Sequence, residues 1–199
     1  MKKKYSIEWL INRLENGDSL KFLYFWGNKK KHDHDIGRFC FSQWFESPFI
    51  VNGVTYMTAE HWMMAQKALL FDNKSIYYKI INSIKPSEAK ELGRQVIGFD
   101  ENIWLKNRYE IVRLGNIHKF NQNRELGEYL LNTGHRILVE ASPVDTIWGI
   151  GLTKDSKDID NIYAWRGLNL LGFALMETRD FFNDYGFSTD LKNDLLIRR

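Results

Sequence analysis

The 199-residue chain has little cysteine and little proline. Its single cysteine, Cys40, excludes an internal disulfide and a metal site built from several cysteines. We interpret Cys40 as an ordinary, partly buried thiol, because free cysteine usually packs as a small hydrophobe. Only three prolines are present, and no glycine- and serine-rich tract interrupts the chain, so a disordered linker is not expected. This length fits one compact domain.

Long apolar runs are missing as well. No window approaches the roughly 18 consecutive apolar residues that a membrane-spanning helix needs. The basic start, MKKKYSIEWLINRLENGD, has no continuous apolar stretch and therefore resembles neither a signal peptide nor a transit sequence. We expect a cytoplasmic protein without a membrane partner. The oligomeric state does not follow from the sequence.

The chain has little net charge. The formal charge of +3 does not require a nucleic-acid partner, but it is compatible with a ligand that carries phosphate. A charged stretch, KKKHDHDIG, contains His32, Asp33, His34 and Asp35, which could in principle bind a metal. Alternating His and Asp beside a lysine run is more typical of a solvated turn, so we expect no metal.

Local signals predict a mainly helical α+β fold, a single compact helical domain with a small β-sheet or hairpin. Ser6 is placed to cap a first helix that ends before Gly17. In FIVNGVTY (49–56), apolar residues flank Asn52-Gly53, which favours a two-residue type I′ hairpin. Further helices are predicted over about 58–71, 74–84, 86–92, 101–119, 123–132 and 167–183, and strands or extended segments over 22–28, 135–142 and 145–152.

Ionisable groups interrupt an otherwise buried helix at TAEHWMMAQKALLF (58–71). At about 100° per residue, Glu60 and Lys67 share one face with Met64 and Phe71. Both charged side chains could therefore point into a single cleft with an apolar wall. The alternative is a structural buried ion pair, or side chains that reach solvent. We expect His61, on another side, to pack and to orient the cleft.

A second polar cluster lies in LVEASPVDTIWGIG (138–151). Glu140 follows a β-branched run, and Asp145 and Trp148 flank a change of direction after Pro143. Loops of this kind often display functional groups. The alternative is a turn acid that caps a backbone amide beside a core tryptophan, because two carboxylates five residues apart are not by themselves an acid–base pair.

Three further polar residues lie beside predicted helix ends. Asn169, in AWRGLNLLG, is near a helix start, where backbone amides bind anions but asparagine is more often a cap. Lys119, in KFNQN, and Arg94, after the helix predicted to end before Gly93, could each contact a phosphate. Surface solubility is the commoner reason for such cations.

Taken in order, these motifs resemble the NADAR (YbiA-like) family. The matching elements are SQWFESPF, GVTYMTAEHWMMAQKALLF, AKELGR, KF.QN, LLNTG, LVEASPVDTIWGIG and WRGLNLLG, which span about residues 22–180. The resemblance is specific because several separate motifs keep one order. It implies a YbiA-like domain over 21–185, with an accessory helix in 1–20 and a tail in 186–199 that lie outside it.

The resemblance implies hydrolysis of an N-glycosidic bond on a ribose that carries phosphate. The favoured substrates are ribosylamino-pyrimidine phosphates, which are early riboflavin-pathway intermediates. The alternative is ADP-ribose attached to guanine in nucleic acid or nucleotides, which predicts a wider groove lined by Lys29–Lys31, Arg38 or Arg124. A third possibility, a module that binds ADP-ribose or a nucleotide without turnover, has little use for Glu60, Lys67 and Asp145.

The chemistry of this bond indicates which residues act. Cleavage builds oxocarbenium character on the ribose, which a carboxylate stabilises while an acid assists the departing base. The carboxylate candidates are Glu60, Glu140 and Asp145. A desolvated Lys67 offers a second route, attack on C1′ to form a Schiff base, although an adjacent Glu60 is expected to hold it charged. We favour Lys67 as nucleophile or electrophilic contact, with Glu60 and Asp145 in proton transfer.

The remaining candidates are substrate contacts. Tryptophans would stack on the flat base, which is worth about 1–3 kcal/mol per base. The expected contacts are Ser42, Trp44, Arg94, Trp104, Lys119, Trp148 and Asn169. No metal and no cofactor is needed for this reaction.

Overall fold

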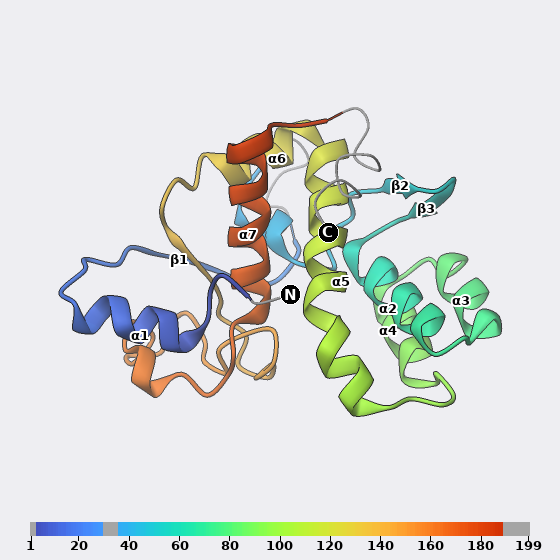
Figure 1. The fold of residues 1–199 in the computed structure, drawn as a ribbon, viewed down its shortest axis with the longest axis horizontal. Helices are drawn as coiled ribbons and strands as arrows, with labels where there is room; N and C mark the ends of the chain where they lie inside the picture. The colour runs from blue at the N-terminus through green and yellow to red at the C-terminus, as the bar shows by residue number, and fades with distance from the viewer. Residues whose placement is uncertain (1–2, 30–35, 189–199) are drawn as a thin grey trace.

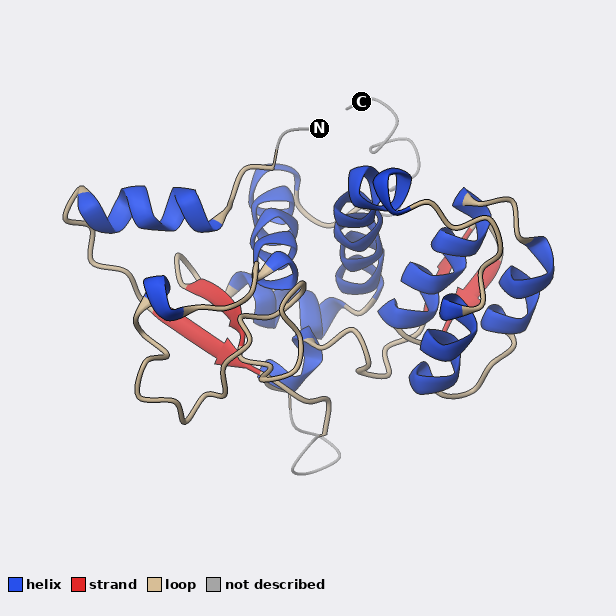
Figure 2. Ribbon diagram, turned by 90° about the horizontal axis from the view of Figure 1, so that it is seen from below, coloured by secondary structure: helices blue, strands red, loops and turns tan. Residues whose placement is uncertain are grey.

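The computed structural model describes residues 3–29 and 36–188, and within these ranges it contains seven α-helices and two small sheets (Figures 1 and 2). The helices are α1 (Ile7–Glu15), α2 (Ala59–Leu70), α3 (Lys74–Ile81), α4 (Pro86–Arg94), α5 (Glu101–Gln122), α6 (Arg124–Leu131) and α7 (Leu170–Tyr185). The strands are β1 (Phe22–Phe25), β2 (Phe49–Val51), β3 (Val54–Tyr56) and β4 (Ile137–Glu140), and two 3₁₀ helices are η1 (Arg38–Phe41) and η2 (Ile162–Ala164). The predicted mainly helical α+β class is confirmed.

Local sequence chemistry sets the starts of several elements. The side chains of Ser6, Thr58 and Asp100 each accept a hydrogen bond from the backbone N–H three residues further on, so they cap α1, α2 and α5. Asn52 and Gly53 have φ values of 52° and 78°, as a type I′ turn requires, and they join β2 to β3. The predicted Ser6 cap and the predicted hairpin are confirmed.

Other boundaries differ from the prediction because tertiary packing decides them. Helix α4 continues through Gly93 and ends at Arg94, so Gly93 does not stop it. A Cβ atom at Gly93 would collide with the sulfur of Met64, so this glycine lets α4 approach α2 closely. Residues 145–152 form irregular extended chain and not a strand, and α7 begins at Leu170.

The larger sheet places Glu140 at a strand end. Strands β1 and β4 pair in parallel, with Phe22 opposite Ile137 and Phe25 opposite Glu140. Helix α7 packs on β4 and also on α5, which lies beside it in the centre of the molecule (Figure 1). On its other side α5 contacts α2, which in turn packs on α3 and α4. Helix α5 therefore joins the sheet to the group formed by α2, α3 and α4.

The N-terminal helix shares the core of the rest of the chain. The Leu10 side chain in α1 is fully buried, while Leu14 on the same helix is 41% exposed. Just before α1, the Tyr5 hydroxyl donates a hydrogen bond to the Asp180 carboxylate of α7, at 2.6 Å. Within the described ranges, every helix is too short or too polar to cross a membrane.

Candidate active site

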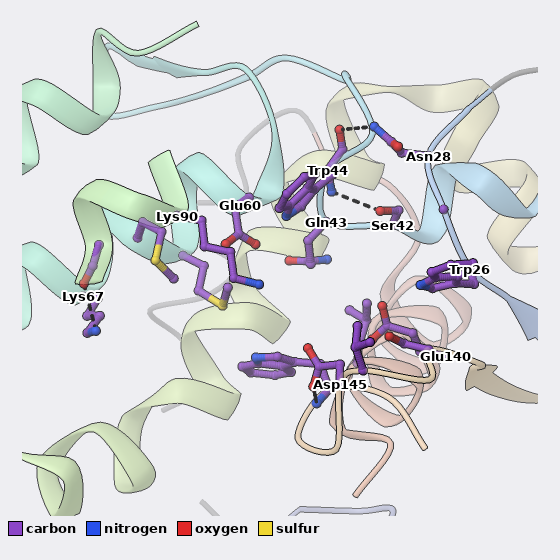
Figure 3. A pocket seen from close by; sticks show the side chains of 18 of the residues that line it. Trp26, Asn28, Ser42, Gln43, Trp44, Glu60, Lys67, Lys90, Glu140 and Asp145 are labelled. Carbon is purple, nitrogen blue, oxygen red and sulfur yellow. Dashed lines mark hydrogen bonds between the residues drawn. The ribbon is translucent and has the colours of Figure 1, made fainter. Parts of the chain in front are cut away.

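A cavity of about 480 Å³ opens between α2, α4 and the carboxyl end of β4 (Figure 3). Its volume falls in the range of pockets that hold one small molecule. Nine of the eleven residues expected from the sequence line it: Ser42, Trp44, Glu60, Lys67, Arg94, Trp104, Glu140, Asp145 and Trp148. The fold thus collects side chains from separate motifs around a single space.

Glu60 is buried in the first turn of α2 and is only 3% exposed. Its backbone N–H donates to the carbonyl of Gln43, at 3.0 Å, which ties α2 to the Ser42–Trp44 segment. Burial raises the pKa of its carboxyl to about 7, although the charge of Lys90 and a hydrogen bond with the Trp44 side chain oppose this. Its Oε1 atom is buried without a hydrogen-bond partner among the described residues.

Glu140, at the end of β4, is the second carboxyl of the pocket. Burial is the main cause that raises its pKa to about 8, and the charges of Asp145 and Glu60 add to it. Its Oε2 atom is also buried without a partner in the described part of the chain. Because the charge of Glu60 helps to raise the pKa of Glu140, the titrations of these two carboxyls are linked near neutral pH.

Asp145 has the turn-capping contacts that the sequence left open, and it also lines the pocket. Its Oδ1 atom accepts hydrogen bonds from the backbone N–H groups of Ile147, at 2.9 Å, and Trp148, at 2.7 Å. These bonds hold the 145–148 turn, which carries the Trp148 side chain. Asp145 therefore shapes this wall and contributes its charge to Glu140.

Lys67 does not pair with Glu60, contrary to our expectation. Its Nζ atom donates to the Gly93 carbonyl, at 2.9 Å, and lies 4.3 Å from the ring centre of Phe99. Figure 3 shows it at one end of the pocket, away from Glu60. Seven residues span about 10 Å along a helix, so a shared face does not bring the two groups into contact. Burial alone lowers the pKa of Lys67, and the cation that acts on Glu60 most strongly is Lys90.

Lys119 and Asn169, both expected to bind substrate, do not line the cavity. The Lys119 side chain is fully buried, and its Nζ donates to the carbonyls of Cys40, at 2.6 Å, and Ser42, at 3.0 Å. The Asn169 amide accepts from the Glu140 N–H, at 3.0 Å, and donates to a β4 carbonyl, at 2.9 Å. The polar atoms of both side chains are used in hydrogen bonds to backbone groups. Both residues therefore support the pocket walls from outside the cavity.

The structure adds pocket residues that we did not single out from the sequence. These are Trp26, Asn28, Gln43, Lys90 and Ser142. Gln43 and Lys90 lie inside the SQW and AKELGR motifs, so these motifs could have indicated both residues from the sequence. Trp26 and Asn28 follow the carboxyl end of β1, where parallel strands commonly place ligand sites.

Two side chains of reactive types, Cys40 and His61, have structural roles. The Cys40 side chain is fully buried, and burial raises the pKa of its thiol to about 12, which excludes a resting thiolate. The His61 ring contacts the Thr58 hydroxyl, at 2.8 Å, and the Ser83 carbonyl, at 3.2 Å. His61 therefore packs behind the pocket, as expected.

Metal ligands do not gather in the described ranges. No group of three His, Cys, Asp or Glu side chains there could hold a metal ion. The alternating residues His32 to Asp35 lie outside the described residues, as do Lys30 and Lys31.

The fold and this site define a class: a mainly helical α+β protein with a small-molecule pocket built around two buried carboxyls. The NADAR domain matches residues 24–183, and the chain belongs to the NADAR family. An N-glycosidase of Acanthamoeba polyphaga mimivirus is 43% identical over 165 residues, which cover 80% of this chain and 95% of that protein.

Two other proteins show how far the likeness extends. The NMR structure of the E. coli protein YbiA superimposes with a TM-score of 0.66 at 27% identity and covers 82% of this chain and 86% of that one. A riboflavin biosynthesis protein of Vibrio vulnificus is 30% identical over 135 residues, which cover 68% of this chain but only 33% of that protein. The resemblance seen in the motifs is confirmed.

Proposed function

We propose that this protein hydrolyses the bond between C1′ and the base nitrogen of a phosphorylated ribosylamino-pyrimidine, as found among riboflavin-pathway intermediates. The chain is an N-glycosidase, in keeping with its family and with the mimivirus relative. One observation carries the proposal: two buried carboxyls, Glu60 and Glu140, face one pocket of small-molecule size. Each has a pKa near neutral and an oxygen to which no described residue donates. The Vibrio vulnificus relative supports the substrate class.

The two carboxyls divide the work of proton transfer. Glu140 has the higher pKa, so it keeps the proton that the departing base nitrogen requires. Glu60, stabilised as an anion by Lys90 and Trp44, supports the positive charge that develops at C1′ and then guides the attacking water. Asp145, which we expected to transfer a proton, instead raises the pKa of Glu140 through its charge.

Lys67 offers the alternative, covalent route. Its pKa is lowered by burial, and no carboxylate among the described residues forms an ion pair with it. In this route the neutral amine bonds to C1′ while the base leaves with the Glu140 proton. Ring opening then gives a Schiff base that water hydrolyses. If the amine stays protonated, Lys67 and the neighbouring Arg94 bind the substrate phosphate.

Product analysis tests the proposal directly. The protein is incubated with a ribosylaminopyrimidine 5′-phosphate, and free base and ribose 5-phosphate are followed by mass spectrometry. Glu60→Gln is expected to slow release at least about 100-fold, whereas Glu101→Gln, at an exposed position on α5, leaves the rate unchanged. Undiminished turnover in Glu60→Gln would overturn the assignment of this carboxyl.

Borohydride trapping separates the two routes. A Schiff base through Lys67 is reduced to a stable adduct, whose mass equals the protein plus the reduced sugar phosphate. Lys67→Ala abolishes that adduct, and Lys74→Ala, at an exposed position on α3, does not. Full turnover without any adduct supports the carboxylate route and leaves Lys67 as a phosphate contact.

The alternative substrate, ADP-ribose on guanine, gains less support from the structure. Arg38 donates to the Tyr24 carbonyl, and Arg124 pairs with Glu128, so neither side chain lines the pocket. A nucleic-acid substrate held by six to ten phosphate contacts would lose about 10³-fold or more in affinity between 50 and 200 mM salt. Competition by single-stranded DNA that carries ADP-ribosyl-guanine, measured across this salt range, distinguishes the two substrate classes.

A further inference from the structure

The side-chain amide of Gln43 has a fixed orientation. Its Nε2 donates to Asn116 Oδ1, at 3.1 Å, and Asn116 Nδ2 donates to the Val112 carbonyl of α5, at 2.9 Å. Because a carbonyl only accepts, it fixes the Asn116 amine on its own side and leaves Asn116 Oδ1 as the acceptor for Gln43. The Gln43 amine therefore faces α5, and its Oε1 faces away from this chain of hydrogen bonds.

Gln43 Oε1 is a buried hydrogen-bond acceptor. The residue is 7% exposed and lines the pocket, and no group of the described residues donates to this oxygen. The only other buried side-chain atoms in this state, among residues 3–29 and 36–188, are Glu60 Oε1 and Glu140 Oε2. Buried polar atoms in proteins are normally satisfied, so three such acceptors around one cavity indicate a ligand that brings donors.

The position of Gln43 indicates which hydrogen-bond donor of a ribosylamino-pyrimidine phosphate it would contact. Figure 3 shows its amide between the Glu60 and Glu140 carboxyls. These carboxyls act at C1′, so the nearest donor that they do not use is the hydroxyl on the adjacent carbon, C2′. A bond accepted from the 2-hydroxyl of a sugar strengthens as the oxocarbenium ion develops. A neutral amide also supplies this acceptor without adding a further negative charge beside Glu60, Glu140 and Asp145.

We propose that Gln43 accepts a hydrogen bond from the ribose 2′-hydroxyl and makes the enzyme select ribosyl over 2′-deoxyribosyl substrates. This inference rests on the proposed function. A site built to bind a hydroxyl leaves its own polar group unpaired with the analogue that lacks it, and discrimination then reaches about 10⁴-fold or more.

The test compares kcat/KM for a ribosylaminopyrimidine 5′-phosphate and its 2′-deoxyribosyl analogue. The ratio of the two values, expected to be at least about 10²-fold in the unaltered protein, falls at least about 10-fold in Gln43→Met. Gln66→Met is the matched control, because Gln66 lies on α2 outside the pocket and also makes a side-chain hydrogen bond, with Tyr56. The Gln66→Met variant is expected to keep the kcat/KM ratio of the unaltered protein. The intrinsic difference in lability between the two bonds is common to all variants and cancels.

An unchanged ratio in a folded Gln43→Met variant would overturn the inference. Binding of the sugar products gives a second measurement that needs no variant and no turnover. By calorimetry, ribose 5-phosphate is expected to bind at least about 10-fold more tightly than 2-deoxyribose 5-phosphate. Equal affinities contradict the inference. If the protein cleaves neither compound, the proposed function fails, and sugar binding still decides the role of Gln43.

Discussion

At the scale of single residues, the pocket is defined by polar atoms that the protein leaves unsatisfied. Among residues 3–29 and 36–188, no group donates to one buried oxygen of Glu60 or of Glu140. The Lys67 amine contacts a backbone carbonyl and aromatic rings. Such groups cost stability in the free protein, and perturbed ionisable groups of this kind cluster at functional sites. The same property that makes these side chains unfavourable for folding makes them reactive toward a ligand.

The coupled carboxyls predict a bell-shaped pH dependence of kcat/KM with its maximum between about pH 7 and 8. Activity rises as Glu60 ionises, with a pKa of about 7, and falls as Glu140 loses its proton, with a pKa of about 8. Initial rates from pH 5 to 10 check this. Glu140→Gln is expected to lower the rate about 10²- to 10⁴-fold and to remove the alkaline decline. A decline that persists in this variant would mean that another group supplies the proton.

Glu60 also predicts how stability depends on pH. Its pKa is about 7 in the fold against 4.5 ordinarily, so the native state holds this proton more tightly than the unfolded state. Between these pH values the free energy of unfolding therefore falls as pH rises, by about 2–3 kcal/mol from this group. Glu60→Gln removes this decrease in the free energy of unfolding. Urea denaturation should therefore show the variant to be more stable than the unaltered protein at pH 8 and nearly equal to it at pH 4.5. Equal stability differences at both pH values would contradict this account.

At the scale of elements, the two walls of the pocket depend on close backbone packing behind them. Lys119 on α5 donates to the carbonyls of Cys40 and Ser42. Asn169, in the left-handed conformation with φ of 49°, holds the end of β4. Gly172 allows α7 to meet β4, because a Cβ atom there would collide with the Leu138 carbonyl and with the Asn169 amide. The position of Glu140 thus follows from a contact between a helix and a strand.

Gly172→Ala tests this contact. The added methyl group has no room beside the backbone, so α7 must move away from β4. This movement weakens the hydrogen bonds between the Asn169 amide and β4. We expect a loss of about 1–3 kcal/mol in the free energy of unfolding, measured by urea denaturation, together with reduced kcat. Asn183→Ala, at an exposed position near the end of α7, is the control. Full activity and stability in Gly172→Ala would show that the strand end tolerates a shift of the helix.

At the scale of the whole molecule, the N-terminal helix and the family domain form a continuous core. The matched domain begins at residue 24, yet Leu10 of α1 is completely buried and Tyr5 bonds to Asp180 on α7. Helix α7 carries the packing that positions Glu140, so α1 contributes to the stability of the site although it lies outside the family motifs.

Leu10→Ala is therefore expected to destabilise the whole protein by about 2–5 kcal/mol, the usual cost of a large cavity in a core. Leu14→Ala on the same helix, where the side chain is 41% exposed, should cost less than about 1 kcal/mol. Thermal and urea unfolding of the pair provide the comparison. A small and equal effect of both substitutions would mean that α1 unfolds independently of the rest.

The sequence by itself determined the local features of this protein. Caps such as Thr58 and Asp100, the Asn52-Gly53 turn and the placement of carboxyls among apolar residues all follow from chemistry within a few residues. The ordered motifs also sufficed for the family. Helical periodicity correctly placed Glu60 and Lys67 on one face, because that depends only on helix geometry.

Only the tertiary structure decided which side chains meet. Lys90 and not Lys67 acts on Glu60, Lys119 turns to the carbonyl of Cys40, 79 positions away, and Gln43 is oriented by Asn116, 73 positions away. Periodicity gives the direction of a side chain from its own helix, but it carries no information about the segment that faces it. Those partners are set by the packing of α5 and α7 against the rest of the chain, which also determines which polar groups are left unsatisfied in the pocket.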